Sequence, residues 1–143
     1  MSQASTIERV MRSDFPRFTP QMPIREAAAL LTRKPAPAAA VIDDSDTLVG
    51  ILTDKDCFRP ILNASYYQQW DGSVADHMSR EVRTLAVDLD LVSAAEEFLA
   101  RSHRVYPVMR DDTVVGLLHR ADLLAAILSA AEYGDPVRFR LDP

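Results

Sequence analysis

The sequence contains two copies of one unit, and this repeat constrains the fold more than any other feature. Shifting the 143-residue chain by 67 positions aligns apolar residues with apolar residues, and late in the unit the offset becomes 66. The aligned pairs include Ile7 with Val74, Met11 with Met78, Phe18 with Leu85, Ile24 with Leu91, Leu31 with Phe98, Val41 with Val108, and Gly50 with Gly116. The extra residue lies in IDDSDTL, compared with MRDDTV, and such a length difference is typical of a surface turn. The sequence therefore predicts two similar structural units in tandem.

Each copy is predicted to contain a strand, a helix, two strands and a second helix. In the second copy, strands are expected at 82–87, 105–109 and 113–118, and helices at 88–103 and 120–133. In the first copy, Pro23 lies near a helix start, and strands are expected at 35–43 and 47–53. One copy alone is too small to bury both faces of its sheet. We therefore expect an α/β (α+β) fold in which two pseudo-symmetric β-α-β-β-α repeats, 7–70 and 74–132, pack together, with short tails at 1–6 and 133–143.

The end of the first copy contains residues that disturb this pattern. Pro60 falls inside the expected helix, where its ring would clash with the carbonyl group of Asp56, so a kink or break is predicted near it. Residues 63–73 connect the two copies, and their aromatic side chains, Tyr66, Tyr67 and Trp70, are expected to cover the core or an oligomer interface.

Composition and charge exclude several classes of protein. The net charge of -5 and the pI of about 5.1 do not suit a general nucleic-acid surface, which requires a basic excess. No apolar run approaches the roughly 20 residues that span a membrane, and the N-terminus lacks a secretory signal. The only cysteine, Cys57, cannot form an internal disulfide. A cytoplasmic protein without nucleic-acid or membrane partners is therefore expected.

A short motif at the end of each copy can be interpreted in two ways. GILTDKD at 50–56 contains Thr53 and Asp56, while GLLHRAD at 116–122 contains His119 and Asp122 at the same places. Spacing alone favours a helix cap, in which Thr53 and Asp56 exchange hydrogen bonds with each other's backbone N–H groups. The same geometry exposes a helix start that attracts an anion. The Thr53 hydroxyl could then donate to a phosphate, and the Asp56 carboxylate could accept from the two hydroxyls of a ribose.

These motifs, in this order and repeated, resemble a tandem pair of cystathionine β-synthase (CBS) domains, called a Bateman module. The resemblance rests on GILTDKD, on His103-Arg104-Val105-Tyr106-Pro107-Val108, and on the lead-in 74–78 with its weaker copy at 7–11. It covers about residues 7–130. It implies the fold described above, dimers formed through helices, and adenosine-containing ligands such as AMP, ADP, ATP or S-adenosylmethionine bound in clefts between the copies. Such modules usually regulate an enzyme, channel or transporter.

The resemblance also assigns roles to individual residues. By the family pattern, Thr53 would hold phosphate or ribose oxygens and Asp56 the ribose. His103 and Arg104 would contact the phosphates, as a similar His-Arg pair does in the γ subunit of AMP-activated protein kinase. The plainer interpretation is that both are solvated residues at a helix–strand junction, with Arg104 near the helix C-terminus.

The two sites implied by the resemblance are not equivalent. The second has Asp122 but His119 in place of threonine, and Ala36-Pro37 stand where the other copy has His103-Arg104. We therefore expect one good site and a second, weaker or empty one, in which His119 could contact phosphate when protonated or act only as a poor cap. Candidate walls for an adenine base are Ile51, Phe18 and Ala38–Ala40, each of which is more simply explained as core.

The sequence leads to one functional hypothesis and one alternative. The hypothesis is a stand-alone regulatory sensor that binds an adenosine-containing ligand and signals through conformation or the geometry of a homodimer to an unknown regulated protein. The alternative is a ligand-free interaction and dimerisation adaptor. No catalytic motif is present, so an enzyme is not expected. The acidic residues Asp43, Asp44, Asp46, Asp111 and Asp112 lie in expected turns, so neither a metal nor any cofactor beyond the regulatory adenine nucleotide or adenosyl compound is expected.

Overall fold

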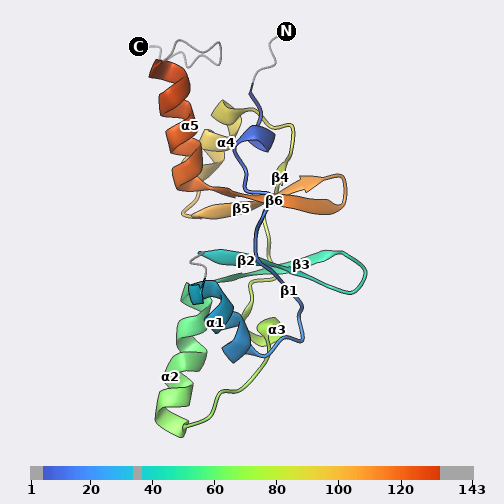
Figure 1. Ribbon diagram of the computed structural model, residues 1–143, viewed down its shortest axis with the longest axis vertical. Coiled ribbons are helices and arrows are strands. Elements are labelled where there is room, and N and C mark those ends of the chain that lie inside the picture. The colour runs from blue at the N-terminus through green and yellow to red at the C-terminus, as the bar shows by residue number, and fades with distance from the viewer. Residues whose placement is uncertain (1–4, 34–36, 133–143) are drawn as a thin grey trace. The chain divides into compact units, whose positions relative to one another are not determined.

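Two compact units make up the part of the chain that the computed structural model describes, residues 5–33 and 37–132 (Figure 1). The first unit is formed by residues 14–83. The second unit is formed by the described parts of 1–13 and 84–143. The repeats in sequence and the units in space therefore divide the chain differently, because the lead-in of each repeat belongs to the unit that contains the other repeat's strands and helices.

The first unit is a three-stranded sheet with helices along one face (Figure 1). The strand order is β1-β2-β3, with β1 parallel to β2 and β2 antiparallel to β3. Its elements are β1 (Arg17–Phe18), α1 (Ile24–Arg33), β2 (Ala38–Ile42), β3 (Leu48–Thr53), the 3₁₀ turn η2 (Lys55–Cys57), α2 (Phe58–Tyr67) and α3 (Val74–His77).

The second unit has the same topology, with sheet order β4-β5-β6. Its elements are the 3₁₀ turn η1 (Ile7–Arg9), β4 (Leu85–Ala86), α4 (Leu91–Ala100), β5 (Val105–Arg110), β6 (Thr113–His119) and α5 (Arg120–Glu132). The hairpin register agrees with the sequence repeat, since Val41 pairs with Gly50 and Val108 with Gly116. Each ladder shifts register immediately after that pair. The predicted repeat and mixed α/β fold are confirmed.

Each unit has its own core, built from the residues that the repeat aligns. In the first unit Phe18, Ile24 and Leu31 pack with β2, β3 and α3 residues. In the second unit the corresponding Leu85, Leu91 and Phe98 pack with Ile7 and with residues of β5, β6 and α5. Burial of such side chains contributes about 1.5–3 kcal/mol each, so the repeated apolar pattern is what stabilises both units.

The lead-in segments, which in the structure extend through Arg12 and Ser79, explain why each motif contains a glycine. In the first unit, residues 78–79 run beside β3, where Ile51 and Ser79 exchange both backbone hydrogen bonds, at 3.0 and 2.9 Å. A Cβ atom at Gly50 would lie 2.5 Å from the sulfur of Met78 and 2.9 Å from the carbonyl oxygen of Ser79. Only glycine allows the lead-in to approach the strand this closely. Gly116, Met11 and Arg12 repeat the arrangement in the second unit.

The region around Pro60 shows how the expected break is accommodated. A 3₁₀ turn, η2, precedes α2, and Pro60 lies in the first turn of α2, where its missing N–H group leaves no intrahelical bond unmade. The helix continues to Tyr67, farther than the sequence indicated. Trp70 packs against the core of the first unit, whereas Tyr66 and Tyr67 are exposed.

Two further sequence expectations can be compared with the structure. The expected strand at 82–87 is shortened to the two residues of β4, because only Leu85 and Ala86 pair with β5. Residues 35 and 36 of the expected strand 35–43 lie outside the described residues, and β2 begins at Ala38. Among the helices described, none has the length and apolar character needed to cross a membrane.

Candidate functional site

Thr53 and Asp56 form a reciprocal cap at the junction of β3 and η2. The backbone N–H of Thr53 donates to Oδ2 of Asp56 at 2.9 Å, and the backbone N–H of Asp56 donates to Oγ1 of Thr53 at 3.2 Å. This is the cap that the spacing predicted. It leaves the Thr53 hydroxyl proton free to donate, and it occupies only one carboxylate oxygen of Asp56. Among the described residues, no cation pairs with Asp56.

Cys57 is the last residue of η2, and its thiol is poorly reactive. Its Sγ lies 3.7 Å from the carbonyl oxygen of Thr53, toward which it can donate weakly, and its side chain is buried. Burial, together with the negative charges of Asp56 and Asp54, raises the pKa of the Cys57 thiol to about 11. A thiol that stays protonated at neutral pH is a poor nucleophile and a poor metal ligand.

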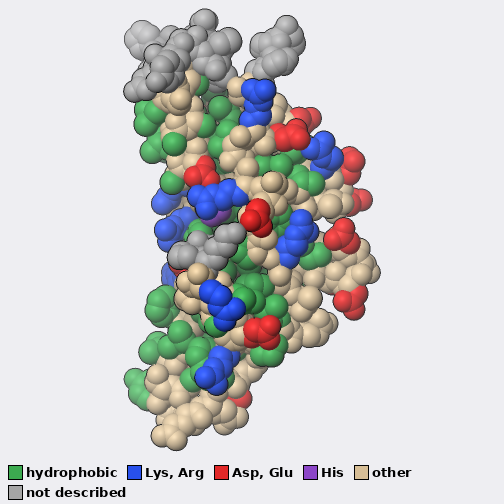
Figure 2. Space-filling model, viewed as in Figure 1, with side chains coloured by type: hydrophobic (Ala, Val, Ile, Leu, Met, Phe, Trp, Pro, Cys, Tyr) green, Lys and Arg blue, Asp and Glu red, His purple; other side chains and the backbone are tan. Residues whose placement is uncertain are grey.

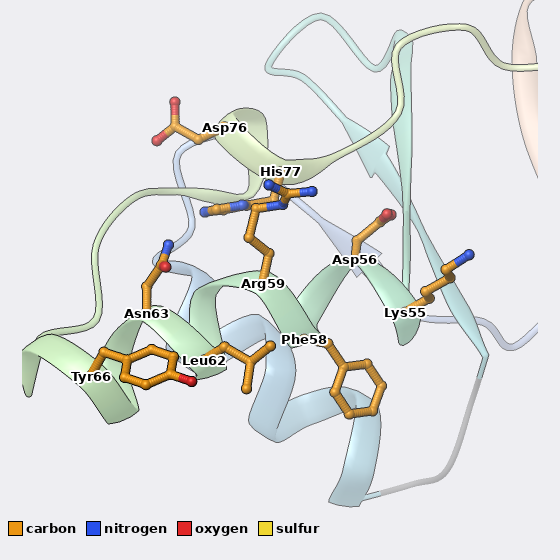
Figure 3. A pocket seen from close by; sticks show the side chains of 9 residues that line it. All are labelled: Lys55, Asp56, Phe58, Arg59, Leu62, Asn63, Tyr66, Asp76 and His77. Carbon is orange, nitrogen blue, oxygen red and sulfur yellow. The ribbon is translucent and has the colours of Figure 1, made fainter.

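Asp56 also lines a pocket of about 750 Å³ on the first unit (Figure 3). Three basic side chains border it, Lys55 from η2, Arg59 from α2 and His77 from α3. Its remaining residues are Phe58, Leu62, Asn63, Tyr66 and Asp76. The carboxylate of Asp76 points away from α2 in Figure 3 and accepts the backbone N–H of Ser73 at 2.9 Å. Lys55 and Arg59 therefore place positive charge on the pocket that Asp56 lines, which suits a ligand that carries negative charge.

The corresponding aspartate of the second unit is already paired. Arg12, in the lead-in, donates from Nε to Oδ2 of Asp122 at 2.7 Å and from Nη2 to Oδ1 at 3.1 Å. The two bonds form a bidentate guanidinium–carboxylate pair. The bond from Arg12, together with its charge, lowers the pKa of Asp122 below its usual value. Both carboxylate oxygens are thus engaged, unlike those of Asp56.

His119 stands where the first copy has Thr53, and it is buried. Burial lowers the pKa of His119 below 6.5; the charge of Arg12 lowers it too, and that of Asp122 raises it. A histidine with a lowered pKa is neutral at physiological pH. The possibility that a protonated His119 contacts phosphate is therefore not favoured by this environment.

His103 and Arg104 lie between α4 and β5 in the second unit. The ring of His103 stacks on Tyr106, with 5.0 Å between ring centroids and 10° between ring planes. Arg104 is exposed, and its carbonyl oxygen accepts the backbone N–H of Arg120 at 2.9 Å. Pro37 accepts from Asp54 in the same way, also at 2.9 Å, which confirms that Pro37 and Arg104 are equivalent positions. A contact of His103 and Arg104 with a ligand remains a prediction.

The residues suggested as walls for an adenine base differ in exposure. Phe18 is 3% exposed and belongs to the core of the first unit, and Ala38 is fully buried. Ile51 is only half-buried, at the edge where β3 meets the lead-in. Ile51 is thus the candidate with surface available to a ligand.

The acidic turns have structural roles. The Oδ1 atom of Asp43 accepts the backbone N–H groups of Ser45 and Thr47 at 2.9 and 3.0 Å, which closes the β2–β3 turn. Asp46 and Asp111 adopt positive φ angles of 63° and 55° in the two hairpin turns. Within residues 5–33 and 37–132, no cluster of three or more metal-ligating side chains is found.

Arg12 is the residue that sequence reasoning overlooked. The repeat aligns it with Ser79, so an arginine appears where the other copy has a small polar residue. That difference was visible in the sequence. Its partner was not, because Arg12 and Asp122 are 110 positions apart and belong to different repeats.

The chain belongs to the CBS domain family. The family model for the CBS domain matches it twice, at residues 7–63 and 74–129. A curated relative, an uncharacterised 17.7 kDa protein of Acidianus ambivalens, is 26% identical over 120 residues, which cover 82% of this chain and 71% of the relative.

Solved structures of CBS-pair proteins share the fold. CBSX2 in complex with AMP is 26% identical, with a TM-score of 0.77 over 88% of this chain and 98% of that one. CBSX2 from Arabidopsis thaliana is 25% identical, with a TM-score of 0.77 over 91% and 99%. The CBS domain pair of protein MJ0100, solved with 5′-methylthioadenosine and S-adenosyl-L-methionine, is 19% identical, with a TM-score of 0.75 over 90% and 98%, and supports the fold alone.

Proposed function

We propose that this chain is a regulatory sensor that binds an adenosine-containing ligand, AMP, ADP, ATP or S-adenosylmethionine, through the Thr53–Asp56 motif. In this proposal Asp56 accepts hydrogen bonds from the ribose hydroxyls, and the Thr53 hydroxyl donates to a ribose or phosphate oxygen. His103 and Arg104 supply donors for a phosphate group, where the ligand has one. Binding changes conformation or dimer geometry, which a second protein detects.

The observation that carries the proposal is the state of the Asp56 carboxylate. Its Oδ2 atom holds the Thr53 N–H, while Oδ1 has no hydrogen-bond partner among the described residues. A half-occupied carboxylate beside the N-terminal end of η2 and α2 can accept from two vicinal hydroxyls without breaking the cap. Lys55 and Arg59 place positive charge nearby. The AMP complex of the similar CBSX2 supports the choice of ligand class.

The proposal is tested by titrating AMP, ADP, ATP and S-adenosylmethionine while following the melting temperature and the heat of binding. Free ligand at 100 times its dissociation constant should stabilise the folded protein by about 2.7 kcal/mol. For a domain of this size, 1 kcal/mol corresponds to roughly 2–4 °C, so the expected shift is about 5–11 °C. No shift with any of the four at millimolar concentration would contradict the proposal.

Asp56→Asn separates the structural role of Asp56 from its binding role. The Asn carbonyl oxygen can still accept the Thr53 N–H, so the cap is retained. The amide NH₂ group, however, would face the ribose donors, so affinity should fall at least about tenfold while the melting temperature of the free protein changes little. Asp90→Asn is the matched control, because Asp90 caps α4 by accepting the Ser93 N–H at 2.7 Å, away from the motif. Equal affinity of parent and Asp56→Asn would exclude the assigned role.

Arg104→Ala examines the phosphate contact separately. We expect it to remove most of the preference for AMP over adenosine while leaving adenosine binding unchanged. Equal loss of AMP and adenosine affinity would show that Arg104 does not contact the phosphate.

Exposed apolar side chains on the helices support the homodimer. Figure 2 shows hydrophobic side chains along α5 and along α2 on the visible face. On α4 and α5, Leu99 is 89%, Leu124 is 59% and Leu128 is 57% exposed. Leu99 and Leu124 border an apolar groove of about 250 Å³ that Phe98, Leu123 and Ile127 also line. Protruding leucines beside a groove on one surface suit a symmetric pairing of two copies, in which each supplies the same patch.

Leu124→Glu should convert the dimer to a monomer, as measured by sedimentation, because it would bury an unpaired charge in each half of the interface. Val115→Thr, on β6 and outside the groove, is the control. If Leu124→Glu leaves the mass unchanged, the interface lies elsewhere. A ligand-free adaptor remains the alternative function, and it would be favoured by a stable dimer that binds none of the four ligands.

A further inference from the structure

The two lead-in segments make the same backbone contacts but carry different side chains. Ser79 exchanges backbone hydrogen bonds with Ile51, and Arg12 exchanges them with Leu117 at 2.9 and 3.0 Å. Each lead-in residue therefore stands beside the strand that precedes the aspartate of the motif. In the first unit this side chain is the short, uncharged hydroxymethyl group of Ser79. In the second it is a guanidinium within reach of Asp122.

Arg12 fills the acceptor positions that a ribose would need. Its Nε and Nη2 atoms contact Oδ2 and Oδ1 of Asp122, so a planar pair of donors engages both oxygens at once. A vicinal diol presents two donors in a similar way. A ribose could bind Asp122 only after displacing the guanidinium, and it would have no equivalent charge to offer in exchange.

From this geometry we infer that Arg12 is the residue that closes the second repeat to nucleosides, by acting as a built-in competitor for Asp122. The inference rests on the proposed role of Asp56, because it treats Asp122 as the same kind of ribose acceptor. It adds that the two motifs differ in their ability to bind a nucleoside because of a lead-in residue, and not only because of His119 and Pro37. Removal of the Arg12 side chain should therefore create a second nucleoside site.

Arg12→Ser is the variant that the chain itself suggests. Serine at the equivalent position of the first unit makes the same pair of backbone bonds, so the lead-in should remain docked. The Arg12 and Asp122 side chains are 49% and 31% exposed, so the loss of their pair should weaken the fold too little to unfold the protein. The variant should therefore fold, which circular dichroism and thermal melting would verify.

Adenosine is the appropriate probe, because the site of Asp122 has Pro37 at the position where the site of Asp56 has Arg104, and so lacks the arginine that could contact a phosphate. Asp56→Asn provides the background in which binding at the first repeat is removed. The experiment compares adenosine binding by Asp56→Asn and by Asp56→Asn/Arg12→Ser, by calorimetry up to millimolar adenosine. The double variant should bind one adenosine per chain, at least about tenfold more tightly than Asp56→Asn alone. Backbone amide shifts at the β6–α5 junction, residues 117–123, should report where it binds.

Glu8→Gln in the Asp56→Asn background is the matched control. Glu8 also lies in the lead-in and forms an exposed pair with Arg110 at 2.7 Å, so its removal perturbs the same segment without freeing Asp122. This control should gain no adenosine binding. A folded double variant that binds no adenosine would overturn the inference, and so would an equal gain with Glu8→Gln.

These outcomes are independent of the test of the first repeat. If the parent protein binds no adenosine-containing ligand but Asp56→Asn/Arg12→Ser binds adenosine, the proposed role of Asp56 fails and the inference about Arg12 stands. If the parent binds one ligand through Asp56 and the double variant binds none, the proposed function stands and the inference fails.

Discussion

Replacing Gly50 with alanine would place a methyl group where the lead-in of the second repeat now lies. The added Cβ would be 2.5 Å from the sulfur of Met78 and 2.9 Å from the carbonyl oxygen of Ser79, whereas ordinary contact begins at 3.4 Å. The sulfur belongs to a flexible side chain and could retreat by about 0.9 Å. The carbonyl oxygen belongs to the backbone and has little such freedom.

The loss of stability can be worked out from the hydrogen bonds that the Ser79 carbonyl group supports. It accepts the backbone N–H of Ile51 at 3.0 Å, and a retreat of about 0.5 Å would stretch this bond to about 3.5 Å, the limit of a useful hydrogen bond. The reciprocal bond from Ser79 to Ile51, at 2.9 Å, would be distorted with it. Two weakened bonds at about 0.5–1.5 kcal/mol each give a loss of roughly 1–3 kcal/mol. Overpacking of a close contact gives the same range.

The assay is urea unfolding together with thermal melting. A loss of 1–3 kcal/mol should lower the melting temperature by about 2–12 °C for a domain of this size. Gly116→Ala should behave alike, because its Cβ would meet Met11 and Arg12 at 2.5 and 3.0 Å. Ser65→Ala, on the exposed side of α2, is the control and should change stability by no more than about 0.5 kcal/mol. A Gly50→Ala protein as stable as the control would refute the close-approach argument.

Two further predictions concern titratable side chains. The pKa of Cys57 is raised from 9.0 to about 11, so a thiol reagent at pH 8 should label the folded protein about 100-fold more slowly than the unfolded chain. Equal labelling rates of the folded and unfolded chains would contradict the burial of this thiol. Since the pKa of His119 is lowered from 6.5 in the folded state, the unfolded chain binds this proton first as pH falls, so the free energy of unfolding should decrease below about pH 6.5. His119→Thr should flatten that decrease in denaturant titrations at pH 5–7, and an unchanged slope would show that another group is responsible.

Much of the fold could be predicted from the sequence because its signals are local. The alignment of Phe18 with Leu85 and of Leu31 with Phe98 identified the two cores, and the hairpins followed from strand formers around acidic turns. The cap between Thr53 and Asp56 was also predictable, since it needs only a spacing of three residues. Pro60 was placed correctly near a break, although its position in the first turn of α2 makes the break milder than its ring suggested.

The sequence by itself determined the repeat, the order of elements and the family, because each depends on apolar patterns and short motifs that can be read along the chain. The tertiary structure decided which of the two aspartates is available. Arg12 reaches Asp122 only because the lead-in of the first repeat docks on the strand of the second. In the first unit Ser79 pairs with Ile51 at the equivalent place, and its short side chain brings no charge to Asp56. A contact across 110 positions is fixed by packing and backbone pairing, and no local pattern encodes it.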